Sequence, residues 1–130
     1  MNTAAVCVGV LGLLVFGLGI GVSLTRGATS TAIGYNPDPT DRLYKMVRAH
    51  GNATEFNPML AILILYLAAH QPSTWVEWMF VVAVLSRVLH AAGMIMSSTL
   101  AKGHPLRAVG AVGTFVSGLV LSVLAIRVSV

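Results

Sequence analysis

Four long apolar stretches, separated by short polar segments, divide the sequence. The first runs from Ala4 to Thr25 and contains no charged residue. The third and fourth cover about residues 74–99 and 105–127, and the second, about residues 39–69, is apolar mainly in its later half. A helix rises about 1.5 Å per residue, so about 20 residues cross a hydrocarbon core of about 30 Å. The pattern predicts an all-α integral membrane protein, a single four-transmembrane-helix bundle over residues 1–130.

The start of the second helix is predicted from the residues that precede it. Residues 27–40 (GATSTAIGYNPDPT) are rich in Gly, Pro and polar residues, a composition typical of a loop. Asp38 is suited to cap a helix and Pro39 to occupy its first position, with Asp41 adding favourable charge to the first turn. We therefore expect the helix to begin near Pro39, and we expect Pro58 to kink it.

Composition supports the membrane assignment and excludes several classes of function. Of the 130 residues, 56% are hydrophobic and 9% are charged, whereas soluble domains contain about 25% charged residues. The formal charge of +4 comes from basic residues scattered near the ends of apolar segments, which does not indicate nucleic-acid binding. Cys7 is the only cysteine, so neither an intrachain disulfide nor a metal cluster is expected. No Walker loop, dinucleotide fingerprint, zinc spacing or Ser-His-Asp order occurs.

A polar stripe interrupts the second apolar segment. At about 100° per residue, Arg48, Asn52 and Glu55 fall within about 60° of one another on a helix. Arg supplies a planar fork of donors, Asn a donor and an acceptor, and Glu a carboxylate, so the stripe is suited to a ligand with carboxylates, amides and an amine. The alternative is an internal ion pair of Arg48 with Glu55 or Arg87 that only holds helices together. Ionisable groups at membrane depth favour a functional site.

A second polar pair lies on the third predicted helix. Arg87 and His90 are three residues apart, and so lie on one face of the helix. A lone His is more often a hydrogen-bonded core residue, but beside an Arg, and in a bundle that also holds Arg48 and Glu55, it favours a site. Glu77 lies near the opposite interface, and we expect it to be solvated or to face headgroups.

The distribution of basic residues predicts the orientation in the membrane. Arg26, Arg42, Lys45 and Arg48 flank the first connection and two further basic residues flank the third, while the second connection contains none. Both termini are therefore expected outside, with the polar site toward the cytoplasm. A signal peptide is the competing interpretation of the first segment, but no Lys or Arg precedes its long apolar core. So small a bundle has little interior for many polar groups, which favours a site completed between subunits.

These residues resemble the MAPEG family, the membrane-associated proteins in eicosanoid and glutathione metabolism, and in particular its bacterial-type members. The resemblance is carried by Arg48-x-x-x-Asn52-x-x-Glu55-x-x-Pro58, by Arg87-x-x-His90, and by Pro105-Leu106-Arg107 at the start of the fourth helix. It covers nearly the whole chain.

The resemblance implies a homotrimer in a membrane, expected to be the bacterial inner membrane, with glutathione or another small thiol bound between subunits near the cytoplasmic face. It implies a cofactor site and, in Arg107, an arginine that stabilises the thiolate. The implied cofactor-binding residues are Arg26, Arg48, Asn52, Glu55, Arg87 and His90. Met94 departs from the pattern of family enzymes that resemble prostaglandin E synthase, which have a tyrosine at this place, and Ala108, directly after Arg107, likewise offers no hydroxyl.

The resulting functional hypothesis is a glutathione-dependent transferase or peroxidase acting on small lipophilic electrophiles or hydroperoxides that enter from the bilayer. The alternative is a non-catalytic membrane module or a small proton-coupled transporter. Glu55 acting alone in a substrate chamber would favour the transporter. The basic residues and Asn52 around it favour recognition of an anionic ligand.

Overall fold

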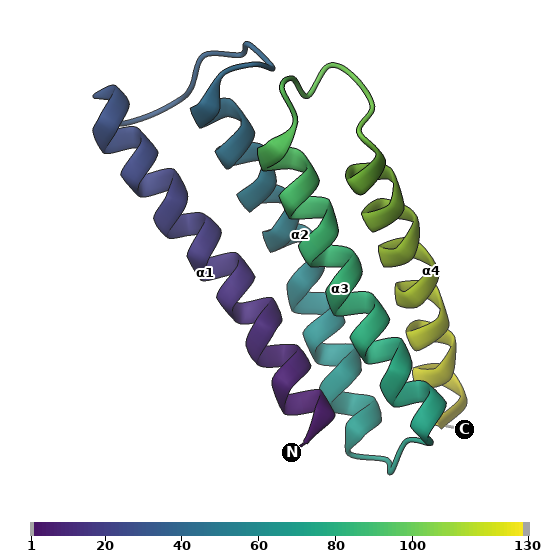
Figure 1. The fold of residues 1–130 in the computed structure, drawn as a ribbon. Coiled ribbons are helices and arrows are strands. Elements are labelled where there is room, and N and C mark those ends of the chain that lie inside the picture. Colours follow the sequence, from purple (N-terminus) through teal and green to yellow (C-terminus); the bar gives the residue numbers. More distant parts are fainter. Residues whose placement is uncertain (1, 129–130) are drawn as a thin grey trace.

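The protein is an antiparallel bundle of four helices, seen in a computed structural model that describes residues 2–128 (Figure 1). The helices are α1 (Thr3–Thr29), α2 (Arg42–Ala68), α3 (Thr74–Met96) and α4 (Pro105–Val128). Both termini lie at the end of the bundle that carries the α2–α3 turn, and the two longer connections lie together at the other end (Figure 1). The described residues contain no strand, so the predicted all-α fold is confirmed.

Three of the helices, α1, α3 and α4, are long and apolar enough to cross a bilayer. Their outward surfaces are apolar, as Leu13 and Phe16 illustrate with 76% of each side chain exposed. The polar first half of α2 keeps it outside that group. Because α1 and α3 run in the same direction, α2 must return the chain between them, and we infer that it crosses the membrane as well (Figure 1).

The predicted start of α2 is wrong by about one turn. The helix begins at Arg42, and its N-cap is Asp41, whose side chain accepts a hydrogen bond of 2.9 Å from the Tyr44 N–H. Asp38 instead closes a turn before the helix, where its Oδ1 accepts from the backbone N–H and the hydroxyl of Thr40. Those two bonds, the backbone one foremost, hold the pKa of the Asp38 carboxyl below its usual value. Pro39 therefore lies in a turn.

Two other helix ends also differ from the predicted spans. Helix α1 continues past Thr25 to Thr29, which places Arg26 in its last turn. Helix α3 ends at Met96 rather than near Thr99, because Ser97 adopts an extended backbone conformation. Helix α2 continues through Pro58 without interruption, and the kink there stays a prediction.

Glycines bring α3 and α4 into direct backbone contact. A Cβ at Gly110 would lie 2.5 Å from the His90 nitrogen and 2.7 Å from the Ser86 carbonyl oxygen. A Cβ at Gly93 would lie 2.7 Å from the nitrogen of Arg107. These distances leave no room for any side chain, so the glycines let the two helix backbones approach closely. The close approach fixes His90 beside the first turns of α4.

Two groups of buried residues form the interior. One, which includes Leu11, Ile64, Phe80 and Leu121, fills the half of the bundle nearer the termini. The second lies in the half nearer the longer connections and consists largely of small side chains, which allow α1, α2 and α3 to approach one another. Its buried members are Leu18, Ala49, Ala53, Ala91 and Met94.

Candidate functional site

Arg87 is the centre of a buried polar network. Only 1% of its surface is exposed, although it lies in an apolar helix. Its Nε donates to Asn57 Oδ1 at 3.0 Å, and its Nη2 donates to Asn52 Oδ1 at 2.6 Å. The guanidinium also lies over the ring of Phe56, 5.1 Å from the ring centre. Burying a guanidinium is costly unless it is hydrogen-bonded, and these contacts supply that compensation.

Asn57 belongs to the network, although the sequence analysis did not select it. It is 2% exposed, and its Nδ2 donates at 3.1 Å to the backbone carbonyl of Leu11 in α1. Asn57 thus joins α1 to Arg87 on α3. Its position two residues after Glu55 lies off the stripe, so helical periodicity gave no reason to choose it. An asparagine directly before Pro58 inside an apolar stretch was the available signal.

The other members of the predicted stripe lie on the surface of the isolated chain. Glu55 is exposed, and its carboxylate interacts electrostatically with Arg87. Arg48 is also exposed, about two turns nearer the start of α2 than Glu55. The structure therefore joins Asn52 to Arg87 directly and leaves Arg48 and Glu55 beside them. Both charged side chains are accessible to a ligand.

His90 and Arg107 are joined across the close α3–α4 contact. The His90 Nδ1 donates to the backbone carbonyl of Arg107 at 3.0 Å, and a carbonyl only accepts, so Nδ1 carries the proton. The guanidinium of Arg107 donates from Nη1 to the carbonyls of Leu100 and Lys102, at 3.3 and 3.1 Å. Arg107 thereby fastens the α3–α4 connection to the first turn of α4.

Arg26 makes no hydrogen bond to the other predicted site residues among the described residues. Its Nη1 donates to three carbonyls of the following loop, of which the closest is Gly34 at 2.8 Å. In this position it orders the start of the α1–α2 connection. Except for Glu55, which is the middle residue of α2, the predicted residues belong to the halves of their helices next to the two longer connections.

An apolar groove begins at Glu55 and follows α2 and α4. Its volume is about 410 Å³, and it faces outward between the two helices. Phe56 and Phe115 meet edge to face in it, with ring centres 5.8 Å apart. Its lining residues are Glu55, Phe56, Met59, Leu60, Leu63, Thr114, Phe115, Gly118, Leu119 and Ser122. The groove offers an apolar surface next to the polar network.

Comparison with known proteins agrees with this arrangement. A model of the MAPEG family matches residues 4–127, nearly the whole chain. The chain belongs to the MAPEG family. No curated protein and no solved structure matched. Membership supports a glutathione-related function in a membrane at the level of the family.

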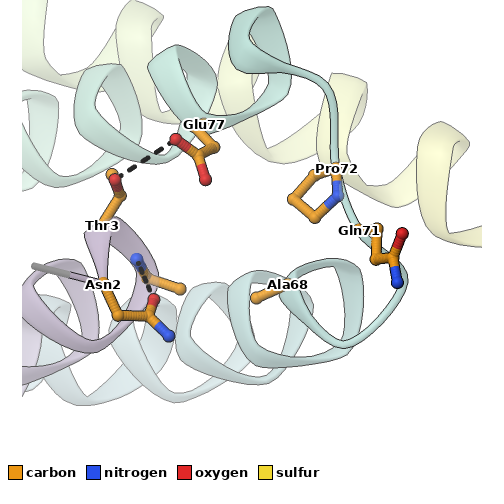
Figure 2. A pocket seen from close by; sticks show the side chains of 7 residues that line it. Asn2, Thr3, Ala68, Gln71, Pro72 and Glu77 are labelled. Carbon is orange, nitrogen blue, oxygen red and sulfur yellow. Dashed lines mark hydrogen bonds between the residues drawn. The ribbon is translucent and has the colours of Figure 1, made fainter.

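A second, polar cavity of about 470 Å³ lies at the far end of this MAPEG protein, beside the termini (Figure 2). Thr3, at one side of this cavity, donates from Oγ1 to Glu77 Oε2 at 3.3 Å. Glu77 is half-buried and hydrogen-bonded, so it is less solvated than the sequence predicted. Among the described lining residues Glu77 is the only charged one, and this cavity offers fewer groups for recognising an anion than the network at Arg87.

The two positions that lack a hydroxyl have different surroundings. Met94 is 7% exposed and packs in the small-residue core with Leu18 and Ala91. Ala108 lies exposed on α4, directly after Arg107. A tyrosine at position 94 would have to displace core residues, which distinguishes this chain from MAPEG enzymes with a tyrosine there.

Proposed function

We propose that this protein is a glutathione-dependent membrane transferase or peroxidase that acts on small lipophilic electrophiles or hydroperoxides. The observation that carries the proposal is the network of Arg87, Asn52 and Asn57 in an otherwise apolar bundle, with the charged Arg48 and Glu55 exposed beside it. Glutathione has two carboxylates, two amides and an amine. These residues offer guanidinium, amide and carboxylate groups of matching kind.

The cofactor site in this proposal consists of Arg26, Arg48, Asn52, Glu55, Arg87 and His90. Arg48 would bind a carboxylate of glutathione, and Glu55 its amine. Arg26 donates to carbonyls of its own loop and makes no hydrogen bond to the other residues of this set within residues 2–128. We infer that it serves the site of a neighbouring copy in a homotrimer.

Arg107 is proposed to stabilise the reactive thiolate. A free thiol has a pKa of about 8.5, so it is mostly protonated at pH 7, and a nearby guanidinium favours the thiolate. In the transferase reaction the sulfur forms a bond to the electrophilic carbon, and the leaving group departs with the bonding electrons. In the peroxidase reaction the sulfur attacks the O–O bond, releasing an alcohol, and a second glutathione completes the disulfide and releases water.

The apolar groove at Glu55 supports a lipophilic second substrate. It lies on the outer surface between α2 and α4, and we expect a lipophilic molecule to enter it from the bilayer. We propose that the protein lies in the bacterial inner membrane with both termini outside and the site toward the cytoplasm.

Turnover of purified protein tests this function. In mild detergent, with glutathione and either 1-chloro-2,4-dinitrobenzene or cumene hydroperoxide, we expect a rate above that of the same mixture without protein. Arg107→Ala should lower the rate, whereas Arg127→Ala, which changes an exposed arginine at the far end of α4, should not. The absence of both reactions in the unmodified protein would contradict the proposal.

A further inference from the structure

In each hydrogen bond around Arg87 the donor and the acceptor are fixed. Asn57 donates from Nδ2 to the Leu11 carbonyl and accepts at Oδ1 from the Arg87 Nε. A backbone carbonyl only accepts and a guanidinium only donates. The Asn57 amide therefore has a single satisfactory orientation, which its two partners fix.

The same reasoning fixes the next amide in the series. Arg87 Nη2 donates to Asn52 Oδ1 at 2.6 Å and also to the Asn52 backbone carbonyl at 3.3 Å. The oxygen of the Asn52 amide is thereby occupied, and within residues 2–128 its Nδ2 makes no hydrogen bond. Asn52 is half-buried, so this NH₂ group remains accessible to a ligand.

From this geometry we propose that Asn57 is a positioning residue, which orients Arg87 so that Asn52 presents its NH₂ group as a hydrogen-bond donor to the bound ligand. The group recognised there is an acceptor, a carboxylate or a peptide carbonyl. The proposal rests on the proposed function insofar as that ligand is glutathione. Asn57 itself does not touch the ligand, because it is 2% exposed and both ends of its amide are occupied.

Burial makes the role of Asn57 specific. Without Asn57, the Nε of a 1% exposed guanidinium would lose its partner, and an unsatisfied buried donor is costly enough to make the side chain move. Asn52 is the other side chain that Arg87 hydrogen-bonds, so a movement of Arg87 frees the Asn52 amide to rotate. The rotating Asn52 amide would then present either its oxygen or its NH₂ group to the ligand.

A double-mutant cycle with glutathione tests the role. By calorimetry on the full chain in detergent, Asn57→Leu should bind glutathione about 10-fold more weakly than the unmodified protein. In an Asn52→Ala background the same change should cost less than about 2-fold, because the 1% exposed Arg87 contributes to the cofactor site through Asn52, which is then gone. Ser117→Ala is the control, since it removes a buried hydroxyl that bonds only within α4. It should leave affinity unchanged.

Conservative variants separate positioning from general packing. Asn57→Asp keeps an acceptor for the Arg87 Nε and should stay within about 3-fold of the unmodified affinity. If Asn57 only held the helices together, this variant should lose affinity, because it lacks the donor to the Leu11 carbonyl. If Asn57→Leu does not assemble, Asn57→Ser takes its place in the cycle, because its shorter side chain cannot reach both partners. An equal loss with and without Asn52 would overturn the proposal.

Nuclear magnetic resonance of ¹⁵N-labelled protein without ligand supplies a readout that is independent of the proposed function. In the unmodified protein the Arg87 Nε–H should exchange slowly with solvent, and Asn57→Leu should abolish that protection and shift the Asn52 NH₂ signals. If the protein bound no glutathione, the proposed function would fail while these signals still decided the positioning role. Unchanged Arg87 and Asn52 signals in Asn57→Leu would overturn it.

Discussion

At the scale of single residues, the arginines of this chain have different tasks. Arg87 is buried, with its Nε and Nη2 hydrogen-bonded within its own chain, whereas Arg48 is exposed and accessible to an anion. Arg107 is half-buried, with one nitrogen holding the α3–α4 connection. Recognition of the ligand and stabilisation of a thiolate are therefore expected to separate on mutation.

Arg107→Ala tests that separation. If Arg107 favours the thiolate, its removal should lower the rate with a model electrophile by about 10-fold or more, with a smaller effect on glutathione affinity. The loss should be partly recovered as the pH rises past about 8.5, because the free thiol then ionises unaided. Rates measured from pH 6.5 to 9.5 check this.

Arg107→Lys provides the companion measurement. A lysine keeps the charge but has one nitrogen in place of the planar fork, whose Nη1 already holds the carbonyls of Leu100 and Lys102, so only partial rescue is expected. A pH profile of Arg107→Ala parallel to that of the unmodified protein would contradict a role in ionising the thiol.

At the scale of helices, the contact between α3 and α4 determines how His90 and Arg107 meet. Gly110 allows the backbones of the two helices to touch at His90, and Gly93 does the same at Arg107. The hydrogen bond from His90 to the Arg107 carbonyl depends on that distance. Packing in this interface therefore positions two residues of the proposed site.

Gly110→Ala should destabilise the protein. The added methyl would lie 2.5 Å from the His90 nitrogen, so the helices must separate, at a cost of about 1–3 kcal/mol. Thermal unfolding in detergent measures the effect. Gly118→Ala is the matched control on the same helix, since its methyl would meet only a Leu60 side-chain carbon at 3.8 Å. Equal losses for both variants would show that the close contact is unimportant.

The helices were easier to predict from the sequence than their ends or the hydrogen bonds between them. Long apolar stretches indicated the helices because crossing a bilayer demands about 20 apolar residues whatever the neighbours are. The start of α2 was misplaced because Asp38 and Asp41 are both good caps, and the turn at Thr40 decides between them. The local sequence alone does not indicate which of the two aspartates caps α2.

The candidate site was predictable only in part, for a related reason. Arg87 stood out as a charge at membrane depth, and Asn52 is its partner. Asn57 was missed because one of its partners is a backbone carbonyl of Leu11, which no side-chain pattern marks. Equally, the burial of Met94 follows from the small residues of other helices that surround it.

At the scale of the whole molecule, one chain does not place every proposed site residue together. Arg26 binds its own loop, and Arg48 and Glu55 lie on the outer surface. A charged carboxylate and guanidinium at membrane depth require a polar neighbour, which another copy of the chain would supply. The exposed charges thus favour an assembly of several copies, and the resemblance to the MAPEG family implies three.

The assembly is tested in mild detergent. Multi-angle light scattering, corrected for bound detergent, should give a protein mass three times that of the 13.6 kDa chain. Arg26→Ala should preserve that mass while weakening glutathione binding, if Arg26 acts across the interface. A uniform population of monomers would contradict the trimer.

Calorimetric titration of the purified protein with glutathione tests the central claim most directly. We predict saturable binding that Arg48→Ala or Glu55→Gln weakens by about 30- to 150-fold, because each loses a charge-assisted contact of about 2–3 kcal/mol. Glu77→Gln, which changes the carboxylate at the opposite end of the bundle, should leave the affinity nearly unchanged. Absence of binding by the unmodified protein, or equal losses in all three variants, would contradict the account.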